Sequence, residues 1–226
     1  GYTLLLALDS TLTMNQSLFS RLPYDPLKDF SAIGRVADIP VVIAASPSFP
    51  ANTVAELIAE ARKTPGMPFF GASAIPMQLA GESFNRAAGI SMSVVNYKGA
   101  AQSVQALLGG EIALSFEGAA TVLPHWRAGK LKVLATTGDK ALDQAPGVPT
   151  VKDAGLPGYS FAVWAALVGP AGLPPAVVQT LNKAMVKAMQ TPTVRDRLAE
   201  LGIIANTSSP EALDRQIRSD AERWGG

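Results

Sequence analysis

Short apolar runs alternate with helical patterns along most of this chain, and this alternation constrains the fold more than any other feature. Runs such as 41–45 are apolar at every position, as in strands that are covered on both faces. Segments such as 54–63 instead carry apolar residues at helical spacing. A strand, a helix and a second strand in succession join parallel neighbours through a right-handed crossover. The sequence therefore predicts an α/β protein with mainly parallel sheets flanked by helices.

The expected elements can be placed by residue number. Strands are expected at 3–8, 41–45, 69–72, 94–97, 114–116 and 133–136, and helices at 54–63, 79–88, 101–108 and 121–128. The last third differs, because helical patterns follow one another at 176–189, at 194–201 and from Ser209-Pro210 onward. Three helices without strands between them predict a covering layer.

Two extended segments, 30–40 and 157–170, look like crossings between lobes. Most of the strand–helix units lie between them. We therefore expect one lobe made of residues 1–36 and 165–226 and a second lobe made of residues 37–164. Ligands usually bind between lobes and at the carboxyl ends of parallel strands, so a ligand cleft is expected between the two lobes.

Composition excludes several classes of protein. The 226 residues include 19 Lys and Arg against 18 Asp and Glu, a balance that excludes the basic footprint of a nucleic-acid binder. Cysteine is absent, which removes thiolate nucleophiles, zinc–thiolate sites and disulfides. The single histidine, His125, has no second histidine or carboxylate at metal-ligand spacing. No apolar run could span a bilayer. We expect no metal, no cofactor and no catalytic residue.

The segment 94–110 indicates binding without catalysis. An apolar run ends at Gly99, and a helical pattern begins at once and closes at Gly109-Gly110. The first N–H groups of a helix lack intrahelical acceptors and, with the helix dipole, attract anions. Gly99, Ala100 and Ala101 are therefore expected ligand contacts. The alternative is that Gly99 serves only a tight strand-to-helix turn.

Polar residues follow two other expected strands. Ser10 and Thr11 come after the first strand, and Ser73 and Ala74 come after the strand 69–72. Serine and threonine hydroxyls and the following N–H groups could hold carboxylate oxygens. The same residues are also common in turns and helix caps.

Several runs occur in a fixed order along nearly the whole chain. They include Leu-Pro-Tyr-Asp-Pro-Leu-Lys-Asp-Phe at 22–30, Tyr-Lys-Gly-Ala-Ala at 97–101, Leu-Leu-Gly-Gly-Glu at 107–111, Val-Pro-Thr-Val at 148–151 and Ala-Gly-Leu-Pro-Gly-Tyr at 154–159. In this order the chain resembles the substrate-binding proteins of tripartite tricarboxylate transporters, the Bug/TctC family.

The resemblance implies a two-lobed periplasmic-binding-protein (Venus flytrap) fold. Such a protein closes on a small carboxylate in the periplasm and delivers it to the membrane permease subunits of a transporter, without cofactor or catalysis. We expect a monomer. The resemblance also implies a preceding strand–helix–strand segment whose Gly-rich loop supplies part of the carboxylate site, and a longer loop within 71–78. We expect both to be missing from this sequence.

The resemblance adds two candidate ligand contacts, Glu117 and Trp164. Glu117 follows the strand 114–116, where family members often carry an acid or amide that reaches the cleft. An acid in an anion site repels the ligand unless it contacts an amine, a water or a protonated partner. The alternative for Glu117 is a solvated or capping carboxylate. Trp164 lies in the return crossing and could stack on a ligand or pack the hinge.

Two other functions stay open at this point. One is an α/β enzyme acting on a small anionic substrate, although the chain lacks G-x-x-x-x-G-K-[ST], G-x-S-x-G and a G-x-G-x-x-G after a strand. The other is a ligand-binding sensory module on the same fold.

Overall fold

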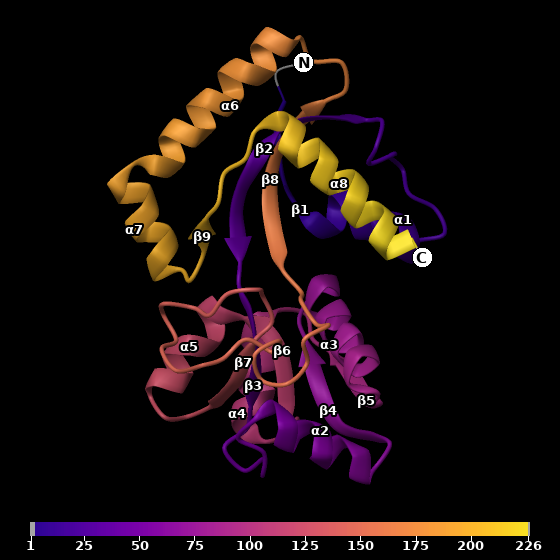
Figure 1. The fold of residues 1–226 in the computed structure, drawn as a ribbon, viewed down its shortest axis with the longest axis vertical. Helices are drawn as coiled ribbons and strands as arrows, with labels where there is room; N and C mark the ends of the chain where they lie inside the picture. The colour runs from indigo at the N-terminus through magenta and orange to yellow at the C-terminus, as the bar shows by residue number, and fades with distance from the viewer. Residues whose placement is uncertain (1–2, 226) are drawn as a thin grey trace. The chain divides into compact units, whose positions relative to one another are not determined.

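The chain folds into two compact units (Figure 1). The computed structural model describes residues 3–225. Unit 1 consists of residues 1–39 and 163–226, and unit 2 consists of residues 40–162. Residues 1, 2 and 226 of the expected first lobe lie outside the described residues. The chain passes between the units at 39/40 and 162/163, against the expected boundaries 36/37 and 164/165.

Unit 1 contains one antiparallel sheet with the strand order β1-β8-β2-β9. The strands are β1 (Leu5–Leu8), β2 (Phe30–Ile39), β8 (Val163–Pro170) and β9 (Ile204–Ala205). The helices are η1 (Ser10–Met14, a π-helix), α1 (Asn15–Leu18), α6 (Pro175–Gln190), α7 (Pro192–Glu200) and α8 (Pro210–Gly225). The core of the unit joins Leu12 of η1 and Val168 of β8 to Leu213 and Ile217 of α8.

The predicted α8 start is confirmed. Ser209 Oγ accepts a hydrogen bond of 3.2 Å from the N–H of Ala212, and Pro210 occupies the first helical position. The expected crossings at 30–40 and 157–170 are in large part strands, since β2 and β8 pair along their whole lengths. Two register shifts in β2, at 32–34 and 35–37, break the alternation that identifies a strand in a sequence.

Unit 2 contains a mixed sheet with the strand order β5-β4-β6-β3-β7. Its strands are β3 (Val41–Ala45), β4 (Gly66–Ala72), β5 (Met92–Asn96), β6 (Leu114–Gly118) and β7 (Lys132–Thr136). Its helices are α2 (Val54–Lys63), α3 (Ile75–Ala88), α4 (Ala100–Gly109) and α5 (Ala119–Arg127). The strand β4 pairs in parallel with β5 and β6, whereas β3 runs antiparallel to β6 and β7.

The two-unit α/β architecture is as predicted, but the prediction of mainly parallel sheets needs correction. Among the named strands of the described residues, parallel pairing joins only β4, β5 and β6, and the sheet of unit 1 is antiparallel throughout. The strands of unit 1 reach their neighbours by returning from distant parts of the chain, and helical crossovers join only the strands of unit 2.

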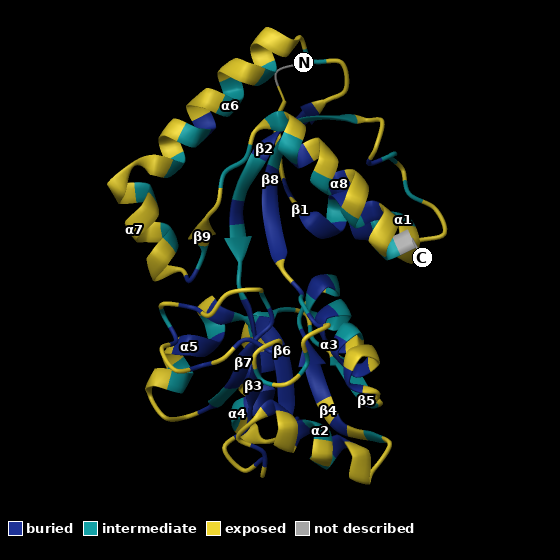
Figure 2. Cartoon of the chain, in the orientation of Figure 1, coloured by how far each residue is buried: buried dark blue, intermediate teal, exposed yellow. Residues whose placement is uncertain are grey.

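Aromatic packing fixes one helix of unit 2 against the sheet. The rings of Phe70 and Phe116 meet edge to face with centroids 5.3 Å apart, and Phe84 of α3 lies 5.7 Å from Phe116. The backbone of α3 touches the same cluster, because a Cβ on Gly81 would lie 2.2 Å from Phe70 Cε2. The strands of unit 2 are largely buried and exposure falls on the outer faces of the helices (Figure 2).

Thr137 joins the two ends of unit 2. Its N–H donates to the carbonyl of Val41 at 3.0 Å, and its Oγ1 donates to the carbonyl of Phe161 at 2.8 Å. The N–H of Phe161 donates back to the carbonyl of Thr137 at 2.9 Å. The segments that enter and leave unit 2 are therefore bonded to the same fully buried residue.

Candidate functional site

The carboxyl ends of β4, β5 and β6 bring most of the predicted contacts of unit 2 to one edge of the sheet. Ala72 is in register with Asn96 on one side and with Phe116 on the other. The segments that follow β4 and β5 carry predicted contacts, and β6 itself carries one near its end. We call this group the strand-end site: Ser73, Ala74, Gly99, Ala100, Ala101 and Glu117.

The first turn of α4 offers free backbone donors at this edge. Gly99 is the N-cap, with no side-chain capping bond, and its carbonyl accepts from the N–H groups of Gln102 and Ser103 at 3.1 and 3.3 Å. The N–H groups of Ala100 and Ala101 precede the first intrahelical bond, and within the described chain they have no acceptor. They are therefore available to an anion, which the helix dipole also favours.

The backbone conformation at residue 99 does not require a glycine. Its φ of 164° and ψ of 162° are those of extended backbone that any residue can adopt. A Cβ built on Gly99 would meet no atom within 4 Å. The tight-turn alternative therefore does not explain this glycine, and the space around its α-carbon is open.

Glu117 is buried at the centre of the site, with 1% of its surface exposed. Its Oε1 accepts a hydrogen bond of 2.8 Å from the Ser73 hydroxyl and one of 3.1 Å from the N–H of Gly118. Its Oε2 is buried and has no hydrogen-bond partner among the described residues. Burial raises the pKa of Glu117, while the bonds from Ser73 and Gly118 and a contact with Ser103 lower it. Glu117 is therefore a buried carboxyl group and not a solvated one.

Two buried serines beneath Glu117 link α4 to the sheet. Ser115 Oγ donates to the carbonyl of Gly71 at 3.1 Å and lies 2.8 Å from Ser103 Oγ. Either hydroxyl can be the donor between the two serines. This pair was not predicted. Its only signal was one serine within each of two apolar patterns.

The remaining predicted contacts belong to unit 1. Ser10 begins η1, and its N–H donates to Asp9 Oδ1 at 2.8 Å, while the carbonyl of Thr11 accepts from the Tyr24 hydroxyl at 2.9 Å. Trp164 is 2% exposed within the core of unit 1, and its Nε1 donates to Asp220 Oδ2 at 3.1 Å. Trp164 is thus a packed core residue.

Asp9 is a second buried acid that the sequence analysis did not single out. It is 1% exposed, and its Oδ2 has no partner among the described residues. Burial raises the pKa of Asp9 to about 7, against the lowering effect of the N–H groups of Ser10 and Trp164. The nearby charge of Asp220 raises it further, and that of Arg35 lowers it. Its signal in the sequence was an acid directly after an apolar strand.

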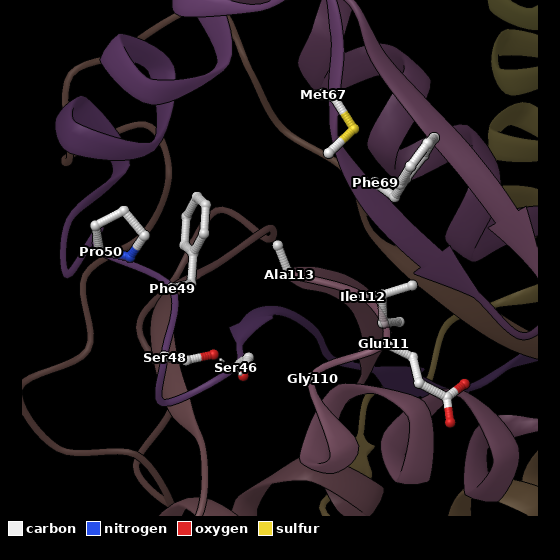
Figure 3. A pocket seen from close by; sticks show the side chains of 10 residues that line it. All are labelled: Ser46, Ser48, Phe49, Pro50, Met67, Phe69, Gly110, Glu111, Ile112 and Ala113. Carbon is white, nitrogen blue, oxygen red and sulfur yellow. Dashed lines mark hydrogen bonds between the residues drawn. The ribbon is translucent and has the colours of Figure 1, made fainter.

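A separate cavity of about 250 Å³ lies where β4 and β6 begin, at the opposite edge of the unit 2 sheet. Its walls are both polar and apolar, Met67 and Phe69 are exposed, and the side chain of Glu111 points away from Phe49 and Met67 (Figure 3). The lining residues are Ser46, Ser48, Phe49, Pro50, Met67, Phe69, Gly110, Glu111, Ile112 and Ala113. None of the predicted contacts lines this cavity.

None of the helices in residues 3–225 is both long and apolar enough to cross a membrane. Over the same range, His, Asp and Glu side chains form no group of three or more that could hold a metal ion.

Comparison with known sequences identifies the family. The model of the tripartite tricarboxylate transporter family receptor, TctC, matches residues 1–226. The protein BugT of Bordetella pertussis is 31% identical over 229 residues, an alignment that covers all of this chain and 70% of BugT. A second relative, from Agrobacterium vitis, is 29% identical and is covered over 66% of its length.

Solved structures agree with that assignment. R. palustris Rpa4515, solved with adipate, superposes with a TM-score of 0.89 at 29% identity, covering 99% of this chain and 76% of that one. MatC from Rhodopseudomonas palustris, solved with bound malate, gives a TM-score of 0.85 at 26% identity, covering 99% and 78%. The predicted family and its periplasmic-binding-protein fold are therefore confirmed. The chain belongs to the tripartite tricarboxylate transporter receptor family.

Proposed function

We propose that this protein is a periplasmic receptor that captures a small carboxylate and delivers it to the permease subunits of a tripartite tricarboxylate transporter. It acts as a monomer and catalyses no reaction. The observation that carries the proposal is the open helix start at Gly99, where the N–H groups of Ala100 and Ala101 have no acceptor in the described chain. Family membership and the adipate and malate in the solved relatives support the same ligand class.

In this proposal one ligand carboxylate lies at the strand-end site. The N–H groups of Ala100 and Ala101 donate to its oxygens, and Ser73 and Ala74 border the same edge. A hydrogen bond to a charged group contributes about 1.5–3 kcal/mol. Micromolar binding needs about 8 kcal/mol, so a few such bonds and modest apolar contact suffice. For Ser10, Thr11 and Trp164 of unit 1 a ligand role stays a prediction.

Neutral backbone donors suit a receptor that must release its ligand. They bind an anion without a fixed counter-charge, so affinity stays moderate and the ligand can leave. The strand-end site contains no histidine or lysine that could act as the base of an acyl or phosphoryl transfer enzyme, and its one hydroxyl–carboxylate pair is Ser73 with the buried Glu117. These features favour the receptor over the α/β enzyme.

Thermal unfolding in the presence of carboxylates tests the proposal. A ligand at about 100 times its Kd adds about 2.7 kcal/mol to the unfolding free energy. For a chain of this size that corresponds to a rise in Tm of roughly 5–10 °C. A panel of acetate, succinate, glutarate, adipate, malate and citrate should contain at least one acid with this effect, while uncharged sugars should have none. If none of these acids raises Tm, the proposed receptor function is refuted.

A further inference from the structure

We propose that Glu117 is protonated in the ligand-bound protein and donates a hydrogen bond from Oε2 to the bound carboxylate, so that binding takes up a proton from solvent. The inference rests on the receptor function proposed above. It assigns a chemical role to an acid that would otherwise repel the ligand.

The two oxygens of Glu117 are in different situations. Oε1 already accepts from Ser73 Oγ and from the N–H of Gly118. Oε2 is buried and has no partner in the described chain. A buried polar atom without a partner is destabilising, whether it is a bare acceptor or a protonated donor. A ligand that supplies the missing partner therefore gains affinity at this atom.

The surroundings of Glu117 favour the neutral form. The flanking strands β3 and β4 and the helix α4 contain no charged residue. Titratable groups on the other nearby segments are Glu82 and Arg86 on α3, His125 and Arg127 on α5, Lys132 on β7, Lys98 before α4, and the phenols Tyr97 and Tyr159. Burial raises the pKa of Glu117, and contacts with Ser73, Gly118 and Ser103 lower it. No cation among the described residues compensates a buried carboxylate here.

A bound anion would strengthen this preference. Ser103, whose hydroxyl contacts Glu117, lies in the first turn of the same helix that offers the free N–H groups. A ligand carboxylate at those N–H groups therefore brings a second negative charge close to Glu117. Two carboxylates that share a site hold a proton between them, because ionisation of both is unfavourable. The proton on Oε2 then forms a charge-assisted bond, which is among the strongest hydrogen bonds in proteins.

The opposite arrangement is an ionised Glu117 that accepts a hydrogen bond from a ligand hydroxyl or ammonium group. The two arrangements predict different proton balances. Protonated Glu117 takes up a proton with an unsubstituted carboxylate such as adipate or succinate. Ionised Glu117 requires a hydroxy or amino acid and takes up none.

Isothermal titration calorimetry of the purified protein distinguishes them. Each of succinate, glutarate and adipate is titrated at pH 7.5 in phosphate and in Tris, whose ionisation enthalpies differ. We expect an uptake of up to one proton per bound acid, and a Kd that weakens by up to tenfold per pH unit above the raised pKa of Glu117 in the free protein. Glu117→Gln replaces the hydroxyl with a permanent N–H donor. Its Kd should be independent of pH, and at pH 8.5 it should bind the acid more tightly than the wild type.

Glu111→Gln is the matched control, since it removes an exposed acid of the same unit from the other edge of the sheet. It should keep the proton uptake of the wild type. Binding of these acids without proton uptake by the wild type would overturn this inference and leave the receptor function intact. If the protein binds only malate or aspartate, and binds them without proton uptake, the inference is overturned and Glu117 is an ionised hydrogen-bond acceptor. Binding of no acid between pH 5 and 8 would overturn both proposals. The wild-type measurement decides the matter even if Glu117→Gln does not fold.

Discussion

The hydroxyl of Ser73 donates a 2.8 Å hydrogen bond to Oε1 of Glu117, across 44 positions of the sequence. The bond connects the residue that follows β4 to the end of the neighbouring strand β6. It directs the buried carboxyl of Glu117 and leaves Oε2 without a partner. The strand-end site thus depends on a contact between the residue after β4 and the end of β6 as well as on the start of α4.

Ser73→Ala should weaken both the fold and the site. The variant loses a hydrogen bond to a buried carboxyl, so its unfolding free energy should fall by about 1 kcal/mol. Carboxylate binding should weaken by about tenfold or more, because the orientation of Glu117 is lost. Urea unfolding and calorimetry measure the two effects. Ser91→Ala, at an exposed loop position, is the control. Unchanged binding by Ser73→Ala would show that this bond does not serve the ligand.

Gly99→Val should block ligand binding without unfolding the protein. A side chain at residue 99 meets no protein atom within 4 Å, so the unfolding free energy should fall by at most about 1 kcal/mol. The same side chain occupies the space in front of the first N–H groups of α4 and should weaken carboxylate binding more than about tenfold. Gly109→Val, at the other end of the same helix, should bind like the wild type. Equal ligand affinities for the two variants would show that the ligand does not bind at the start of α4.

Stability should depend on pH through Asp9. Its folded-state pKa of about 7 lies above the ordinary value of 3.8, so the folded protein binds this proton more tightly than the unfolded chain. The stabilisation is complete below pH 3.8 and is lost as the pH rises through 7, which amounts to about 4 kcal/mol. Asp9→Asn removes this dependence, so its unfolding free energy relative to the wild type should rise between pH 5 and 8.

Urea unfolding of both proteins at each pH measures the difference. Asp139→Asn, which changes an exposed acid, controls for net charge. If the wild type and Asp9→Asn lose stability in parallel across this range, the pKa of Asp9 is not raised in the folded state.

Gly81→Ala should destabilise unit 2. The added methyl group would lie 2.2 Å from Phe70 Cε2, so α3 or the Phe70 ring must shift. Overpacking of this kind costs about 1–3 kcal/mol. Gly109→Ala is the matched control, since its methyl group approaches only Glu111 Oε1, at 3.9 Å, and should stabilise α4 by at most about 1 kcal/mol. Thermal unfolding that ranks the two variants the other way would contradict the close packing of α3.

Local sequence signals predicted much of unit 2. The bounds of α2 and β3 match the predicted ranges 54–63 and 41–45. A cap accounts for the first match, since Thr53 Oγ1 accepts from the N–H of Glu56 at 3.1 Å. In unit 1 the central strands β2 and β8 were predicted as crossings. Their pairing joins distant segments with two register shifts, and no local pattern reports such pairing.

The candidate site was predictable in position but not in chemistry. A strand end and a glycine before a helix indicated Ser73 and Gly99, and the family resemblance indicated Glu117. The state of Glu117 depends on which donors reach each of its oxygens, and that follows from the register between strands. The π-helix at Ser10–Met14 was not predicted, because five residues are too few for a helical period to be recognised.

The position of β8 between β1 and β2 has a consequence for synthesis of the protein. Both N-terminal strands pair with β8 and not with each other. A nascent chain therefore completes all of unit 2 before β8, the strand that pairs with β1 and β2, is translated. Unit 2 can fold while translation continues, whereas the sheet of unit 1 has to wait for residues 163–170.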